Sequence, residues 1–196
     1  SPEPAPEDAA LAAAKDAAAL KRTLLEQARA RGETPKPVEI ERALGKVLAE
    51  REIRTALADL RAAGAKVDYR ACDVRDGEAF STLINQIYAD HGRIDAVLHG
   101  AGVIEDKLLV DKTPESFARV FGTKIDSSIT LARALKPESL KLLVFFTSVA
   151  GRYGNKGQSD YAAANEAVNR LAWQLSRDWS DTRVMAMNWG PWDAGM

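Results

Sequence analysis

After Gly64, apolar stretches alternate with stretches of helical spacing, and this alternation constrains the fold more than any other feature. The apolar stretches, which we expect to be strands, are residues 65–73, 94–102, 140–149 and 182–190. Between them lie stretches whose apolar residues share one helical face, namely 76–93, 113–135 and 159–179. Strands that are nearly all apolar are typical of a parallel sheet buried on both faces. The sequence therefore predicts an α/β fold, a parallel sheet with helices on both faces.

The first part of the chain has a different character and predicts two helices. One helix is expected to begin at Asp8, a favourable N-cap residue, and to continue until Gly32 ends it. The second is expected to start at Pro37. We interpret residues 1–63 as a helical hairpin insertion and residues 64–196 as the α/β domain. A pair of helices that binds a partner protein is the alternative.

Composition argues against several classes of partner. The chain has 196 residues, with 27 basic and 28 acidic side chains and a net charge of −1. This balance predicts no nucleic-acid surface and no polybasic membrane patch. No apolar run approaches the ~18 residues that a membrane helix needs. The one cysteine, Cys72, excludes a disulfide within the chain and fits a reducing compartment, so we expect a cytoplasmic protein.

Polar or glycine-rich residues stand at the ends of the predicted strands. Ligands of parallel α/β sheets bind beyond the carboxyl ends of the strands. These ends carry Asp73, the segment 99–102, the pair Thr147 and Ser148, and the segment 188–191. Several such ends at one edge of a sheet predict a ligand site there.

A tyrosine and a serine suit the reduction of a ketone. Ser148 ends a strand, and Tyr161 follows thirteen positions later, early in a helix. A tyrosine titrates near ~10 and can donate a proton to the developing alkoxide if a cation lowers its pKa. The position four residues after the tyrosine, where such sites usually carry lysine, is Asn165. The preceding helical region offers Lys112 and Lys124 instead, although a surface lysine is the alternative reading of Lys124.

Five segments together resemble a known family: "DVRD", "LHGAGVIEDKLL", "VFGTK", "FFTSVAGRYGNKGQSDYAAAN" and "MNWGPWDAGM". They are similar to the ketoreductase domains of polyketide and polyunsaturated-fatty-acid synthases, which belong to the short-chain dehydrogenase/reductase superfamily. The resemblance covers roughly residues 64–196 and implies a Rossmann-like sheet. It also implies a catalytic tetrad in which lysine and asparagine are exchanged. Position by position, that tetrad is Lys124, which lowers the tyrosine pKa, Ser148, Tyr161, the proton donor, and Asn165, which supports the geometry.

The resemblance implies NADPH as the cofactor and no metal. Asp73 and Val74 match residues that contact the adenine of the cofactor. Residues 100–102 match small residues that let the backbone approach its ribose. The expected cofactor-binding set is Asp73, Val74, His99, Gly100, Ala101, Gly102, Thr147, Asn188, Gly190 and Pro191. No glycine-rich turn precedes Asp73. We therefore expect the first strands of the sheet to be missing from this chain, and the chain alone to be inactive.

The segment "VIED", residues 103–106, resembles the Leu-Asp-Asp signature of ketoreductases that form a 3R hydroxyl. Asp106 matches the final aspartate, and Tyr153 stands where the opposite class carries tryptophan. Ile104 and Glu105 depart from the signature. The resemblance thus implies a 3R product.

The implied function is the reduction of a 3-ketoacyl chain on an acyl carrier protein to its 3-hydroxyacyl form, beside the other domains of a multidomain synthase. Two alternatives stay open. One is a catalytically incomplete fragment or interaction module of a synthase. The other is a free-standing short-chain dehydrogenase that acts on small alcohols.

Overall fold

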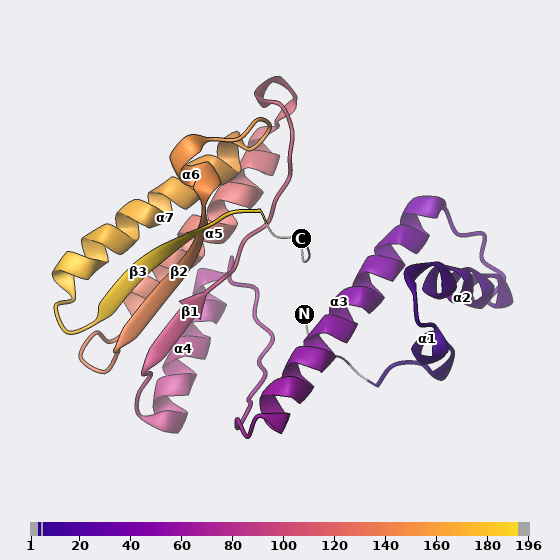
Figure 1. The fold of residues 1–196 in the computed structure, drawn as a ribbon, viewed down its shortest axis with the longest axis horizontal. Helices are drawn as coiled ribbons and strands as arrows, with labels where there is room; N and C mark the ends of the chain where they lie inside the picture. Colours follow the sequence, from indigo (N-terminus) through magenta and orange to yellow (C-terminus); the bar gives the residue numbers. More distant parts are fainter. Residues whose placement is uncertain (1–3, 5, 192–196) are drawn as a thin grey trace. The chain divides into compact units, whose positions relative to one another are not determined.

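The computed structural model describes residue 4 and residues 6–191, and the chain divides into two compact units (Figure 1). The N-terminal unit is Ser1–Ala71 and the C-terminal unit is Cys72–Met196. The predicted boundary after residue 63 falls at the end of a long helix in the first unit.

The N-terminal unit is helical, with α1 at Ala9–Ala13, α2 at Ala17–Ala30 and α3 at Pro37–Ala62. The predicted helical hairpin is confirmed, because α2 packs against α3 around the buried Leu20 and Leu44.

The prediction of one continuous helix from Asp8 was wrong, because the helix is interrupted between α1 and α2. The Asp8 carboxylate does cap α1, accepting hydrogen bonds from the first backbone N–H groups. The helix then ends at Ala14, and a new one begins because Asp16 accepts from the backbone N of Ala19 at 2.7 Å. A second N-cap residue within an alanine-rich stretch thus divides the helix.

The predicted strand at 65–73 was also wrong. Those residues form neither helix nor strand, and their polar side chains bond locally, as Arg70 does to Asp68 at 2.7 Å. A strand exists only where a neighbour pairs with its backbone groups. Among the described residues, no ladder partner lies beside this segment.

The C-terminal unit contains a parallel sheet of three strands in the order β1-β2-β3. The strands are β1 at Ala96–His99, β2 at Leu142–Ser148 and β3 at Arg183–Trp189. In the register, His99 pairs with Phe145, and Ser148 pairs with Trp189. The carboxyl ends of the three strands therefore meet at one edge of the sheet, as the sequence predicted for them, whereas Asp73, the fourth predicted end, does not end a strand.

The helices of this unit are α4 (Gly77–His91), α5 (Pro114–Ala134), the short α6 (Val149–Tyr153) and α7 (Ser159–Asp178), with a 3₁₀ turn at Leu109–Asp111. The predicted starts of α4 and α5 are confirmed by their caps. Asp76 accepts from Ala79 N at 3.0 Å, and Thr113 accepts from Ser116 N at 3.2 Å. The α/β class with a parallel, Rossmann-like sheet is confirmed.

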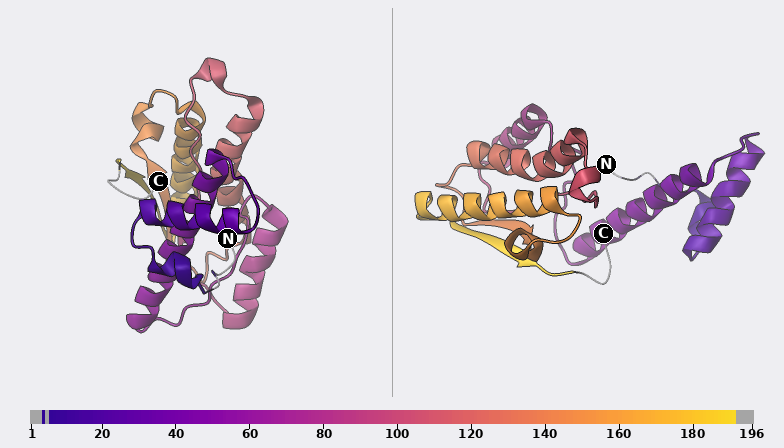
Figure 2. Two further views of the ribbon diagram at one scale, coloured as in Figure 1. Left: turned by 90° about the vertical axis from the view of Figure 1, so that its right-hand side faces the viewer. Right: turned by 90° about the horizontal axis from the view of Figure 1, so that it is seen from above.

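The three long helices of the unit lie along one face of its sheet (Figure 2). On that face, Leu143 and Phe145 are fully buried and belong to one core with Val168 and Ala172 of α7. On the other face, Leu98 is 65% exposed. A second covered face of the sheet thus stays a prediction.

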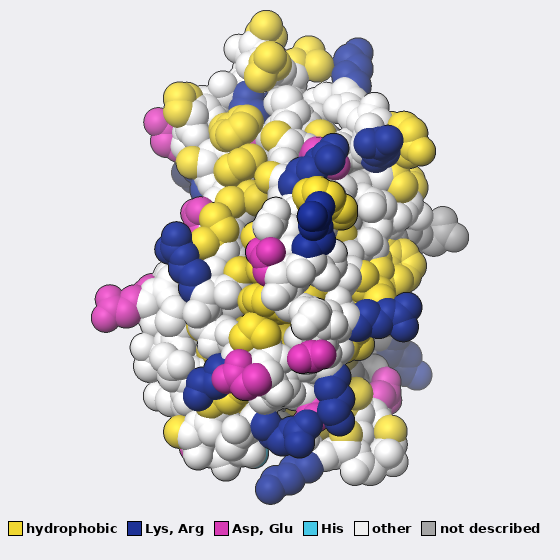
Figure 3. Space-filling view, turned by 90° about the vertical axis from the view of Figure 1, so that its left-hand side faces the viewer, with side chains coloured by type: hydrophobic (Ala, Val, Ile, Leu, Met, Phe, Trp, Pro, Cys, Tyr) yellow, Lys and Arg dark blue, Asp and Glu magenta, His cyan; other side chains and the backbone are white. Residues whose placement is uncertain are grey.

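The surface shows no segregation of charge on the face in Figure 3, where basic, acidic and apolar side chains are interspersed. Within residues 6–191, no helix combines the length and the apolar character required to cross a bilayer.

Candidate functional site

Ser148 and Tyr161 line the same cavity of about 410 Å³. Ser148 is the last residue of β2 and caps α6, because its Oγ accepts from the backbone N of Ala150 at 3.1 Å. Tyr161 lies in the first turn of α7. The strand end and the helix start thus bring the two predicted hydroxyls to one cavity, whose wall also includes Ile104, Tyr153, Gln158, Gly190 and Pro191.

Lys124 is buried, so the surface-lysine alternative was wrong. It lies on α5, is 5% exposed, and its Nζ donates to the carbonyl oxygen of Phe146 at 2.7 Å. Burial lowers the pKa of Lys124 from 10.5 to about 8. At neutral pH the side chain is therefore still mostly an ammonium. Its bonding partner Phe146 lies on β2, two residues before Ser148.

Asn165 is also fully buried. Its Nδ2 donates to the backbone oxygen of Tyr161 at 2.8 Å, one turn earlier on α7. Among the described residues, its Oδ1 has no hydrogen-bond partner, and neither has the buried Oγ1 of Thr147 near the end of β2. Buried polar atoms normally have a partner, so both oxygens are suited to bind a water or a ligand donor.

Sequence reasoning missed Gly151, which sets the distance between α6 and α7. A Cβ at this position would lie 2.9 Å from the backbone N of Glu166 and 3.0 Å from Cβ of Asn165. Only glycine allows this approach, because the clashing atoms belong largely to backbone. The available signal was a glycine in the short helical segment between Ser148 and Tyr153, where no turn requires one.

His99 has a buried side chain that is already bonded. It is 6% exposed, its Nε2 lies 2.9 Å from Oγ of Ser127, and its ring meets Phe145 edge to face. Burial lowers the pKa of His99 to about 4, with the Lys124 charge as a smaller cause. The neutral imidazole therefore anchors β1 to α5, and a contact between His99 and a cofactor stays a prediction.

Glycines directly after β1 approach the strand and helix beside it. A Cβ at Gly100 would lie 3.6 Å from the Phe146 ring, and a Cβ at Gly102 would lie 3.2 Å from Cε of Lys124. Ala101 between them is half-buried. The segment Gly100–Gly102 thus passes close to the predicted catalytic lysine.

Asp73 and Val74 lie in the turn before α4. The Asp73 carboxylate is 2.6 Å from the guanidinium of Arg75, whose hydrogen bonds lower the pKa of Asp73 to about 2. A bond from Asp73 to an adenine would have to compete with this ion pair, so the adenine contact stays a prediction.

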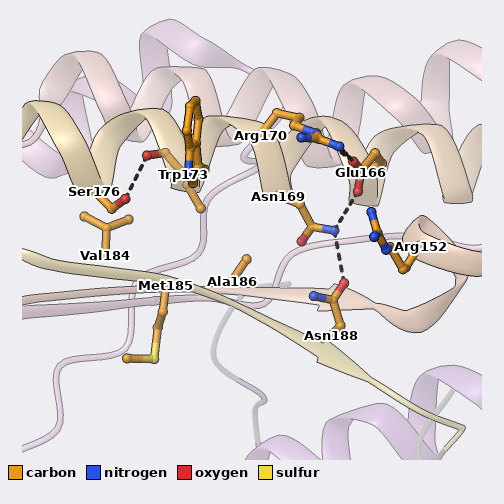
Figure 4. Close-up of a pocket in the computed structure, with 11 residues that line it drawn as sticks. Arg152, Glu166, Asn169, Arg170, Trp173, Ser176, Val184, Met185, Ala186 and Asn188 are labelled. Atoms are coloured by element: carbon orange, nitrogen blue, oxygen red, sulfur yellow. Dashed lines mark hydrogen bonds and ion pairs between the residues drawn. The ribbon is translucent and has the colours of Figure 1, made fainter.

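Asn188 lies apart from Gly190 and Pro191. Its Oδ1 accepts from Nδ2 of Asn169 at 3.0 Å, and it lines a second cavity beside α7 (Figure 4). Gly190 and Pro191 line the cavity of Tyr161 instead. Of these three predicted cofactor-binding residues, the structure thus brings Gly190 and Pro191 to the candidate site and turns the Asn188 side chain towards α7.

Tyr153 lines the Tyr161 cavity, whereas Asp106 bonds to a residue of the cavity wall. The Asp106 carboxylate accepts from Nε2 of Gln158, a residue of the cavity wall, at 3.0 Å. Tyr153 lines the cavity and is 84% exposed.

Lys112, the second candidate ammonium, forms an ion pair with a residue outside the cavity wall. Its Nζ lies 2.6 Å from Oδ2 of Asp160, the residue before Tyr161. Sequence reasoning missed Asp160, and the available signal was an acidic residue directly before the tyrosine.

The family model described as the KR domain matches residues 39–194. The chain belongs to the KR domain family. A polyunsaturated fatty acid synthase protein of Thraustochytrium sp. is 39% identical over 175 residues, which cover 88% of this chain and 6% of that protein. Polyketide synthase PksN of Bacillus subtilis is 36% identical over 148 residues, 71% of this chain and 3% of that protein. The KR chain thus spans a small part of these curated relatives.

Solved ketoreductase structures share the fold of this KR chain. An N-terminal ketoreductase from the macrolactin assembly line superposes with a TM-score of 0.68 at 31% identity, over 73% of this chain and 30% of that one. A ketoreductase domain from the bacillaene assembly line gives a TM-score of 0.66 at 35% identity, over 74% of this chain and 36% of that one. The predicted ketoreductase resemblance is confirmed.

Proposed function

We propose that this KR chain contributes the catalytic residues for reducing a 3-ketoacyl chain, carried by an acyl carrier protein, to the 3-hydroxyacyl form. One observation carries the proposal. The residues Ser148 and Tyr161 line one cavity with their hydroxyl side chains, and the buried ammonium of Lys124 bonds to β2, the strand that ends at Ser148. Two hydroxyls and a cation are the groups that stabilise and protonate a developing alkoxide.

The residues present fit a nicotinamide cofactor, and we propose NADPH. Gly100 and Gly102 offer backbone without side chains after β1, and Oγ1 of Thr147 is buried with no partner in the part of the chain that the structure describes. Residues 100–102, Thr147, Gly190 and Pro191 would hold the cofactor. When bound, NADPH supplies a hydride to the carbonyl carbon of the substrate.

The chain's own residues act on the carbonyl oxygen. The Ser148 hydroxyl donates a hydrogen bond to it, and the Tyr161 hydroxyl gives it a proton as it becomes an alkoxide. The Lys124 ammonium favours the phenolate that Tyr161 then carries. Asn165 holds the first turn of α7 through its bond to the Tyr161 carbonyl, and its free Oδ1 can bind the water that returns a proton to the phenolate.

We further propose a 3R product, supported by Tyr153 in the cavity wall and by the bond of Asp106 to Gln158 of that wall. The proposed partners are the acyl carrier protein and the other domains of a synthase, as the names of the relatives suggest. The proposed location is the cytoplasm.

The test is Tyr161→Phe in the full-length protein, with NADPH and a 3-ketoacyl thioester. The rate of reduction should fall by roughly 10²-fold or more, as expected for loss of a general acid. Tyr88→Phe is the matched control, because Tyr88 lies on α4 and its hydroxyl bonds to Lys136 N away from the cavity. A Tyr161→Phe protein that keeps its rate would exclude Tyr161 as the donor. A wild-type protein that reduces small free ketones as readily as carrier-bound chains would favour a dehydrogenase of small alcohols.

A further inference from the structure

A buried ion pair joins the loop before α5 to the start of α7. The Nζ of Lys112 and Oδ2 of Asp160 are 2.6 Å apart, and their side chains are 2% and 1% exposed. Two charges removed from water are stabilising only when their remaining hydrogen bonds are also satisfied. A pair with so little exposure therefore needs further partners, and these partners connect it to the candidate site.

Both ends of the pair bind backbone next to the cavity. The other carboxylate oxygen of Asp160, Oδ1, accepts from the backbone N of Tyr161 at 2.9 Å. The Lys112 ammonium also donates to the backbone oxygen of Glu105 at 2.7 Å. Glu105 follows Ile104, which lines the cavity with Tyr161. One ion pair thus links the backbone of the proposed proton donor to the segment that carries Ile104 of the cavity wall.

Two further bonds connect the same segments. The backbone N of Lys107 donates to the carbonyl oxygen of Gly157 at 3.0 Å, and Gln158 donates to Asp106 at 3.0 Å. Residues 105–107 therefore lie along residues 157–160. Of these connections, the ion pair is the buried one, whereas the Gln158 bond is exposed.

The loop is fixed on its other side by α5. The Glu105 carboxylate accepts from Oγ of Ser116 at 2.7 Å and from the Arg119 guanidinium at 2.8 Å. Breaking the ion pair would leave this anchor on α5 intact and would leave only the bonds of Lys107 and Asp106 between the loop and residues 157–158. The ion pair is thus the buried link between the segment of Ile104 and the start of α7.

We propose that Lys112 and Asp160 are positioning residues for the reduction, which set the Tyr161 hydroxyl against the cavity wall that orients the substrate carbonyl. Neither residue lines the cavity, so neither contacts the substrate. The role rests on the proposed function. It predicts that loss of the pair lowers kcat and makes the configuration of the hydroxyl less uniform.

The test uses Asp160→Asn in the full-length protein. Asparagine keeps an oxygen for the Tyr161 N–H and removes the charge. We expect kcat to fall at least tenfold, the KM for NADPH to stay within twofold, and the ratio of 3R to 3S product to fall at least fivefold. Amide hydrogen exchange should become faster in residues 103–112, a readout that needs no activity. Lys141→Met is the matched control, since it breaks a Lys–Asp pair of 3.4 Å whose lysine side chain is 74% exposed.

A second variant keeps the test decisive if the lone change unfolds the protein. Lys112→Met with Asp160→Leu replaces the pair by apolar side chains and should fold without restoring kcat or the product ratio. Full recovery of both in this double variant would overturn the proposal, because the pair would then serve stability alone. A double variant that cannot fold would overturn it as well.

If the wild type reduces the thioester and Asp160→Asn matches it in rate and configuration, the positioning role fails while the proposed function stands. If the wild type reduces no 3-ketoacyl thioester, the proposed function fails and the positioning role with it.

Discussion

Replacing Lys124 by methionine should separate stability from activity. The Lys124 ammonium is 5% exposed, and burial lowers its pKa from 10.5 to about 8. That difference means that the fold destabilises the charged ammonium relative to the neutral amine by roughly 3 kcal/mol. Methionine removes the buried charge and also the hydrogen bond to Phe146, which contributes about 1 kcal/mol. The free energy of unfolding at pH 7 should therefore rise by roughly 2 kcal/mol.

The pH dependence of stability gives an independent check on this reasoning. Between pH 8 and 10.5 the unfolded chain keeps the Lys124 proton while the folded chain has released it. Stability therefore rises with pH across this window, because the unfolded state binds more protons. The Lys124→Met protein should lack this rise.

Activity should change in the opposite direction to stability. Without the cation, the rate of reduction should fall by roughly 10²-fold or more. The wild-type rate should also decline above pH 8, as Lys124 loses its proton. Urea denaturation at pH 7, 8 and 10 measures stability, and NADPH oxidation with a 3-ketoacyl thioester measures the rate. A variant that is less stable than the wild type at pH 7 and equally active would refute both the burial cost and the catalytic role.

Two further predictions concern Gly151 and His99 of the C-terminal unit. Gly151→Ala should lower the free energy of unfolding by roughly 1–3 kcal/mol, because its Cβ would meet the Glu166 backbone N at 2.9 Å. Gly45→Ala on α3 of the N-terminal unit, where a Cβ meets no described atom within 4 Å, should instead raise it by about 1 kcal/mol, and equal effects in urea denaturation would contradict this contrast. His99 has a pKa of about 4 in the fold against an ordinary 6.5, so stability should fall as pH drops from 6.5 to 4. His99→Gln should flatten that slope in the same measurement, and an unchanged slope would mean that another group causes it.

Hydrophobic periodicity and capping residues predicted those helices and strands that depend on a few neighbouring residues. The apolar run at 140–149 and the Thr113-Pro114 start of α5 correspond to observed elements because hydrophobic periodicity and capping act over a few residues. The strand predicted at 65–73 failed because a strand depends on a neighbour, which sequence spacing does not reveal. The predicted helix from Asp8 failed because alanines favour helix on both sides of Asp16 and conceal the second cap.

The site divides in the same way. The meeting of Ser148 and Tyr161 follows from a strand end and the helix after it, so their spacing was informative. The burial of Lys124 depends on how α5 packs on the sheet, and a helical pattern showed only that one side was apolar. The Lys112–Asp160 pair joins residues 48 positions apart, so only the fold reveals it.

In the proposed reaction, Tyr161, Ser148 and Lys124 act together to reduce a carrier-bound ketone. The most direct measurement incubates the full-length protein with NADPH and a 3-ketoacyl chain on its acyl carrier protein, and follows NADPH absorbance and product mass together. We expect a product heavier by two hydrogen atoms, formed in step with NADPH oxidation, and its near-complete loss in Tyr161→Phe. NADPH oxidation without that product, or the same product at the same rate from Tyr161→Phe, would exclude this reaction.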